Sequence, residues 1–122
     1  DPFLLAEAKA FARYLCSRVP VAHAPRMRGA RWADDPAAWS AMQRKVPQSV
    51  GDAFALVEQQ YLRGPYVLGD ALSSCDYYLL MLARWLEADG VDLARLPRVV
   101  AHRRRMLELP LVRRVIAQEE GA

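Results

Sequence analysis

Apolar residues recur every three or four positions through most of this chain of 122 residues. That spacing places them on one side of an α-helix, and the strict alternation typical of a half-buried β-strand is missing over any useful length. Prolines precede several of these segments, where a helix tolerates them because the first N–H groups have no helical partner. The pattern predicts an all-α fold, a helical bundle of about five helices.

The first helix is expected from residue 2 to about residue 19. Pro20 and Pro25 then disturb it, because each removes a backbone donor and clashes with the preceding turn. Residues 26–35 mix Gly, Arg, Trp and Asp without periodicity, which predicts a loop. The apolar side of this helix is expected to contain Phe3, Leu4, Ala10, Phe11, Tyr14, Leu15 and Val19.

A second long helix is expected from Pro36 to about residue 62, with Asp35 as its N-cap and a break or bend near Pro47. Gly64 and Pro65 end it. Its inward side is expected to contain Val50, Ala53, Phe54, Val57 and Tyr61.

The clearest local signal is the start of the next helix at Ser73. The Ser73 hydroxyl is expected to accept from the Asp76 N–H, while the Asp76 carboxylate accepts from the Ser73 N–H, as in a capping box. Residues 77–86 are apolar almost all the way round, which is typical of a helix enclosed by others. This helix is therefore predicted to lie at the centre of the bundle, ending at Gly90.

Two shorter helices are expected after it, over residues 97–109 and from Pro110 onward. Each begins at a proline. The packing side of the last helix is expected to contain Leu111, Val112, Val115 and Ile116.

Composition bounds the class of protein. Apolar residues make up 53% of the chain and charged residues 25%, as in soluble globular domains. The apolar runs are well short of the ~20 residues that a membrane span needs, so no membrane association is predicted. A net charge of +3 is too small to indicate nucleic acid as a partner. Lone cysteines suit a reducing, cytoplasmic location.

Few residues offer chemistry of their own, and no catalytic residue, resident cofactor or metal ligand is predicted. Ser73 and Asp76 are explained by capping. Cys75 is expected to be small and buried. His23 and His102 lack metal-ligand spacing, which favours surface or capping roles. A group of arginines is expected to form a solvated face rather than a phosphate site: Arg98, Arg103, Arg104, Arg105, Arg113 and Arg114.

Several motifs resemble the C-terminal domain of the glutathione S-transferase family, and most closely its bacterial beta class. The segment Ser73-Ser74-Cys75-Asp76 stands where that family carries an S-x-A-D box. Gly-Pro-Tyr-Val-Leu-Gly-Asp over residues 64–70 precedes it, and Asp76-Tyr77-Tyr78-Leu79 leads on to Arg84-Trp85. The tail is similar in Arg105, Met106, Glu108, Pro110, Val112, Ala117, Glu119 and Gly121.

The resemblance implies that residues 1–122 form the C-terminal substrate-binding and dimerisation domain, with the thioredoxin-like catalytic domain absent from this chain. The partners implied are glutathione as co-substrate, a small hydrophobic electrophile and a second copy in a homodimer. The substrate-binding residues implied are Arg13, Tyr14, Ser17, Val21, Tyr78 and Trp85. Tyr14, Val21 and Tyr78 are expected to leave an apolar patch when the other domain is missing.

Two positions depart from the beta class. Pro20 stands where that class usually has His, and Val21 where a polar or basic side chain is common, so two contacts to glutathione are missing. His23, three residues beyond Pro20, is a candidate substitute. The alternative is a non-catalytic helical scaffold of the same fold that docks other proteins.

Overall fold

The computed structural model describes residues 1–121, and within them it contains helices and no β-strand, which confirms the all-α prediction. Five helices have ten or more residues: α1 (Pro2–His23), α3 (Pro36–Leu56), α4 (Ser74–Ala83), α5 (Pro97–Leu107) and α6 (Pro110–Gly121). Shorter elements join them: α2 (Pro25–Arg28), η1 (Gly29–Arg31), the π-turn η2 (Val57–Tyr61) and η3 (Leu93–Arg95). None of the helices in this part of the chain is long and apolar enough to cross a membrane.

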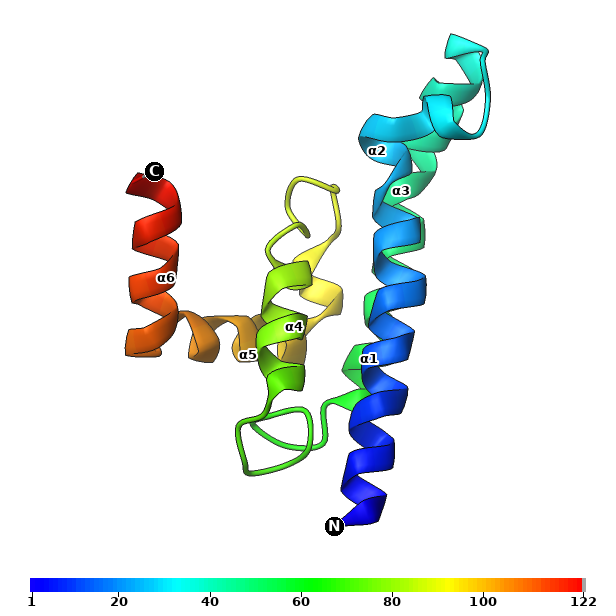
Figure 1. The fold of residues 1–122 in the computed structure, drawn as a ribbon. Helices are drawn as coiled ribbons and strands as arrows, with labels where there is room; N and C mark the ends of the chain where they lie inside the picture. The colour runs from blue at the N-terminus through cyan, green and yellow to red at the C-terminus, as the bar shows by residue number, and fades with distance from the viewer. Residues whose placement is uncertain (122) are drawn as a thin grey trace.

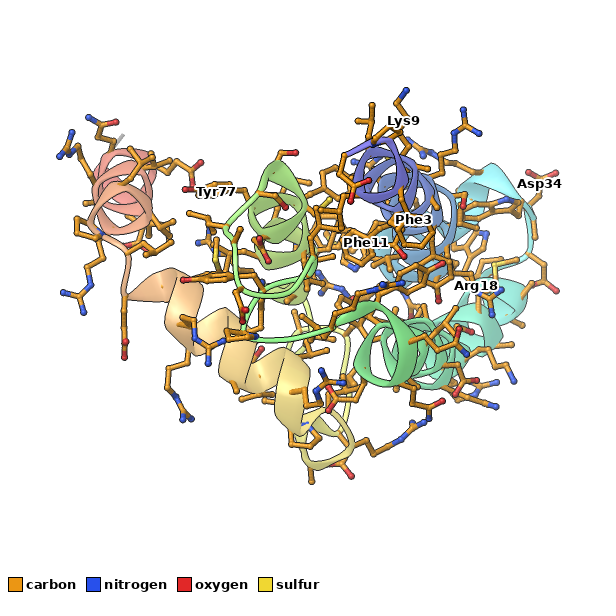
Figure 2. All side chains as sticks on the ribbon, turned by 90° about the horizontal axis from the view of Figure 1, so that it is seen from below. Phe3, Lys9, Phe11, Arg18, Asp34 and Tyr77 are labelled. Carbon is orange, nitrogen blue, oxygen red and sulfur yellow. The ribbon has the colours of Figure 1, made fainter. Side chains whose placement is uncertain are left out.

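The long helices α1 and α3 run side by side in opposite directions, and α4 also packs against α1 (Figure 1). The helix α5 crosses behind α4 in this view and also contacts η2, while α6 stands beyond α4. Phe11 points from α1 into the middle of this arrangement, whereas Lys9 points away from it (Figure 2). The core is formed mainly by side chains of α1, α3 and α4, including Phe11, Leu15, Phe54 and Leu79.

Both long helices continue through the prolines that were expected to interrupt them. The helix α1 includes Pro20 and ends at His23, and α3 includes Pro47. A proline in a helix interior costs about 3 kcal/mol, and burial of neighbouring side chains such as Val19 and Val46 offsets this cost because most helix stability comes from tertiary packing. The expected inward positions Phe3 and Leu4 are exposed, since the first turn of α1 extends beyond the core, and Ala10 is exposed because it lies on the outer side of α1, beside the buried Phe11.

The helix α5 is capped by a side chain from another element. Glu58 lies in η2, and its two carboxylate oxygens accept from the backbone N–H groups of Arg98 and Val99, each at 2.7 Å. Arg98 in turn donates to the Glu58 and Leu62 carbonyls. A carboxylate at a helix N-terminus satisfies free donors and complements the helix dipole. This contact therefore fixes α5 against the end of α3.

Asp76 has more partners than a helix cap requires. It forms the capping box with Ser73, whose N–H donates to Asp76 Oδ2 at 2.9 Å. Its other oxygen, Oδ1, accepts from the Val67 N–H and contacts His102 Nε2, both at 2.8 Å. The carboxylate is fully buried. Asp76 consequently joins α4, the 64–70 turn and α5 at one point.

The expectation of a surface or capping role for His102 is wrong, because this residue is 1% exposed and faces Asp76. Burial opposes ionisation of Asp76, but the hydrogen bonds from His102, Val67 and Ser73 outweigh it and lower the pKa of Asp76 below its usual value. The ionised carboxylate can only accept, so Nε2 of His102 carries the proton.

Replacing Asp76 should cost far more than removing a cap. Asp76→Ala leaves three buried donors without an acceptor, and we expect it to lower the free energy of unfolding by about 3 kcal/mol. Asp35→Ala removes an exposed N-cap that accepts from the Ala37 N–H, and should cost about 1 kcal/mol. Urea unfolding of both variants tests this, and equal losses would contradict the buried junction.

The Asp76 contribution should also depend on pH. A carboxyl with a lowered folded-state pKa stabilises fully above its unfolded pKa of about 3.9 and loses that contribution as pH falls through the folded value. The difference in unfolding free energy between the natural chain and Asp76→Asn should therefore be constant above about pH 5 and shrink below about pH 4. Urea titrations from pH 3 to 6 measure it, and a difference that grows in acid would refute this sign.

Candidate functional site

The substrate-binding residues that the resemblance implied are distributed over α1, α4 and the segment after α4, and Val21 lines a cavity between α1 and α3. Arg13, Ser17 and Val21 are exposed at four-residue intervals on α1, and the Ser17 hydroxyl donates to the Arg13 carbonyl at 2.8 Å. Tyr78 lies on α4 and Trp85 just beyond its end, both half-buried. Residues three or four apart lie on one side of a helix, which explains why the sequence brings the α1 set together.

Cys16 and Tyr78 meet where α1 and α4 face each other, here called the α1–α4 face, and Cys16 was not predicted as part of a site. Its Sγ atom lies 2.8 Å from the Tyr78 hydroxyl, so the pair connects α1 to α4. This hydrogen bond, with some burial, raises the pKa of Tyr78 and keeps the phenol protonated at neutral pH. No local pattern in the sequence indicates this contact, because its two residues are 62 positions apart.

Tyr14 does not belong to the exposed face, so the expected apolar patch of Tyr14, Val21 and Tyr78 is not formed as a unit. The Tyr14 ring stacks on Tyr61 with centroids 5.2 Å apart, and its hydroxyl donates to the Ala53 carbonyl at 2.7 Å. Burial raises the pKa of Tyr14. Its position on the α3 side of α1 explains the difference, and Val21 is left 60% exposed.

The C-terminal end of α1 is joined to the segment after α4 by a buried carboxylate. Asp89 is 2% exposed, and its oxygens lie 2.6 and 2.8 Å from Nδ1 of His23. Nε of Arg26 lies 3.0 Å from Asp89 Oδ1. His23 also stacks on Trp85, with ring centroids 4.1 Å apart and planes inclined by 20°. A simple surface or capping role for His23 is therefore also wrong.

A cavity of about 300 Å³ opens beside this stack. His23 and Trp85 form one wall, and the rest of the lining comes from the end of α1, α2 and η1: Pro20, Ala24, Met27, Arg28 and Arg31. The wall is mainly aromatic and aliphatic, with cationic groups at its edge. Such a cavity suits a small ligand with an apolar body.

The remaining candidate groups have structural environments. Cys75 is 4% exposed, as expected, and burial raises the pKa of its thiol. Among residues 1–121, no three His, Cys, Asp or Glu side chains gather where they could hold a metal ion. Four of the arginines expected on a solvated face donate to backbone carbonyls: Arg98, Arg103, Arg105 and Arg113.

The fold is a helical bundle of a recognisable class. It has a long antiparallel helix pair, a capped central helix and two shorter helices that begin at prolines. It is the helical fold of the glutathione S-transferase C-terminal domain, as the sequence motifs predicted. No known family model matches the chain, and no curated protein does either.

A particular solved structure is similar over nearly the whole chain. It is a crystal structure of a glutathione transferase homolog from Sulfitobacter with bound glutathione. The two share 37% sequence identity over 98% of this chain, with a TM-score of 0.92. This chain spans 57% of the length of that protein.

The exposure of the two cysteines gives a direct test of the α1–α4 face. Cys16 is exposed and Cys75 buried, so a disulfide reagent such as dithiobis(nitrobenzoate) should modify one thiol per chain in the folded protein and the second only after unfolding. Cys16→Ser should abolish the rapid reaction, and Cys75→Ser should preserve it. Rapid reaction of both thiols would contradict the packing of α4 against α1.

Proposed function

We propose that this chain is the C-terminal, substrate-binding domain of a glutathione transferase of the bacterial beta class. The main support is its 37% identity, over almost its full length, to a homolog that holds glutathione. Arg13, Ser17, Tyr78 and Trp85 add to this, because they are at least partly exposed and stand at positions that the family resemblance assigns to substrates. The catalytic domain of thioredoxin type is proposed to lie outside this chain.

The proposed reaction is attack of the glutathione thiolate on a polarised carbon of a hydrophobic electrophile. A carbon–sulfur bond forms, and the leaving group departs with its electron pair. Tyr78 and Trp85 supply an apolar wall that excludes water from the reacting atoms, which strengthens electrostatic interactions there. Arg13 and Ser17 are proposed to approach glutathione. Activation of the thiol is assigned to the thioredoxin-like domain.

Two further proposals accompany this function. The protein acts as a homodimer in the cytoplasm, as the family resemblance implies. Pro20 cannot make the contact to glutathione that a histidine makes at this position in the beta class. We propose that His23 makes that contact instead, because its ring lines the cavity beside Pro20.

The alternative function is a non-catalytic scaffold, and one surface favours it. Between α4 and α6 lies an apolar groove of about 310 Å³, into which Tyr77 points (Figure 2). Met81, Leu111 and Val115 line the groove and are between 44% and 54% exposed. Exposed apolar surface of this kind suits a protein contact. The expectation that α4 is enclosed on all sides is wrong here, because α6 leaves this side open.

Reading the coding sequence on either side of this chain tests the proposal first. A thioredoxin-like β-α-β segment upstream, with a Ser, Tyr or Cys near its start, is expected for a transferase. The chain alone should not accelerate the reaction of glutathione with chlorodinitrobenzene, and the complete protein should. A complete protein without activity toward any aryl halide or related electrophile would favour the scaffold.

Variants of α4 then test the role of its two sides in the complete protein. Tyr78→Ala should raise KM for the electrophile about fivefold to tenfold, because it removes apolar contact worth about 1 kcal/mol or more. Tyr77→Ala is the matched control on the α6 side and should leave KM unchanged. Equal effects of the two variants on KM, or no effect of Tyr78→Ala, would argue against the proposed electrophile wall.

A further inference from the structure

The cavity beside Trp85 has an excess of positive charge that the fold does not use. Arg26, Arg28 and Arg31 lie within six residues of each other, and the one buried carboxylate nearby, Asp89, is occupied by Arg26 and His23. Arg28 and Arg31 line the cavity and form no ion pair with any residue from 1 to 121. Uncompensated cations at the edge of an apolar cavity are suited to an anionic ligand.

His23 has a second ring nitrogen that the fold does not use. The Asp89 carboxylate holds Nδ1, which fixes the ring and its proton on that nitrogen. The second ring nitrogen, Nε2, makes no hydrogen bond to the described residues, although the ring itself lines the cavity. The Trp85 ring stacks on the imidazole, and together with the Asp89 contact it holds the His23 ring in the cavity wall.

The contacts within the fold explain the positions of only two of these four basic residues, which are His23, Arg26, Arg28 and Arg31. Asp89 joins the end of α1 to the segment after α4, which explains why His23 and Arg26 are where they are. It does not explain Arg28 and Arg31, which are exposed, make no side-chain hydrogen bond to the described residues and surround an apolar cavity. Arginine is also the side chain best suited to bidentate recognition of a carboxylate.

We propose that this cavity receives an aromatic or similarly apolar group bearing a carboxylate, with Arg28 and Arg31 binding the anion. The apolar body lies against the Trp85–His23 stack, and Nε2 of His23 contributes to the polar edge. This inference rests on the proposed function, because it specifies the electrophile as one that carries a negative charge. Trp85 belongs both to this cavity and to the proposed electrophile wall, so one ligand can occupy both.

A binding experiment on the chain itself tests the site without depending on catalysis. The probes are 4-chloro-3-nitrobenzoate and its uncharged methyl ester, titrated calorimetrically at low and at moderate salt. We expect the acid to bind at least about tenfold more tightly than the ester, with the preference falling as salt screens the charges. Arg28→Ala/Arg31→Ala should remove this preference and leave ester binding unchanged. Both arginines are exposed, so the variant should fold as the natural chain does.

Another exposed arginine, Arg18, serves as the matched control. Arg18 lines a separate cavity between α1 and α3, and Arg18→Ala should leave the preference for the acid intact. Equal binding of acid and ester, or an undiminished preference in the double variant, would overturn the anion site. Turnover of aryl halides by the complete protein, with 4-chloro-3-nitrobenzoate tested beside chlorodinitrobenzene, is measured separately: if it occurs while the preference is absent, the proposed function survives and this inference fails. If the preference is present without turnover, the site stands and the transferase assignment fails.

Discussion

The buried carboxylate of Asp76 is the interaction on which the arrangement of the bundle most depends. It accepts from the N–H groups of Ser73 and Val67 and from His102, and these three donors come from the start of α4, the 64–70 turn and α5. An ion without solvent is tolerated only when its hydrogen-bonding capacity is filled. The three segments must therefore meet in one geometry, and that geometry sets the direction in which α4 carries Tyr78 toward α1.

Much of this fold could be predicted from the sequence because local signals and burial agree. The spacing of Phe11, Leu15 and Val19 indicated the buried side of α1, and the Ser73-to-Asp76 spacing indicated the start of α4. The predicted interruptions at Pro20 and Pro47 were wrong because the position of a helix end depends on side-chain packing along the helix as well as on the proline. A proline cost of about 3 kcal/mol is small beside the burial of two full turns of side chains.

The spacing of apolar residues does not predict contacts between segments that are far apart in the sequence. His102 and Asp89 look like ordinary polar residues on helix or loop sequences, yet each is buried against a partner more than twenty positions away. Glu58 gives no sign in the sequence that it caps α5, because the π-turn that aims its carboxylate has no simple sequence signature. The same limit applies to the candidate site: the spacing of Arg13 and Ser17 on one helix can be read from the sequence, whereas the contacts of Cys16, His23 and Asp89 join different elements.

The two histidine–carboxylate pairs have a mechanical consequence for the central helix. One pair, His102 with Asp76, anchors its start to α5, and the other, His23 with Asp89, ties the segment after its end to α1. Because α4 is attached to α5 at its start and to α1 just beyond its end, it cannot tilt toward one of these helices without straining its attachment to the other. The two pairs therefore connect α1 to α5 through α4 and the segment that follows it.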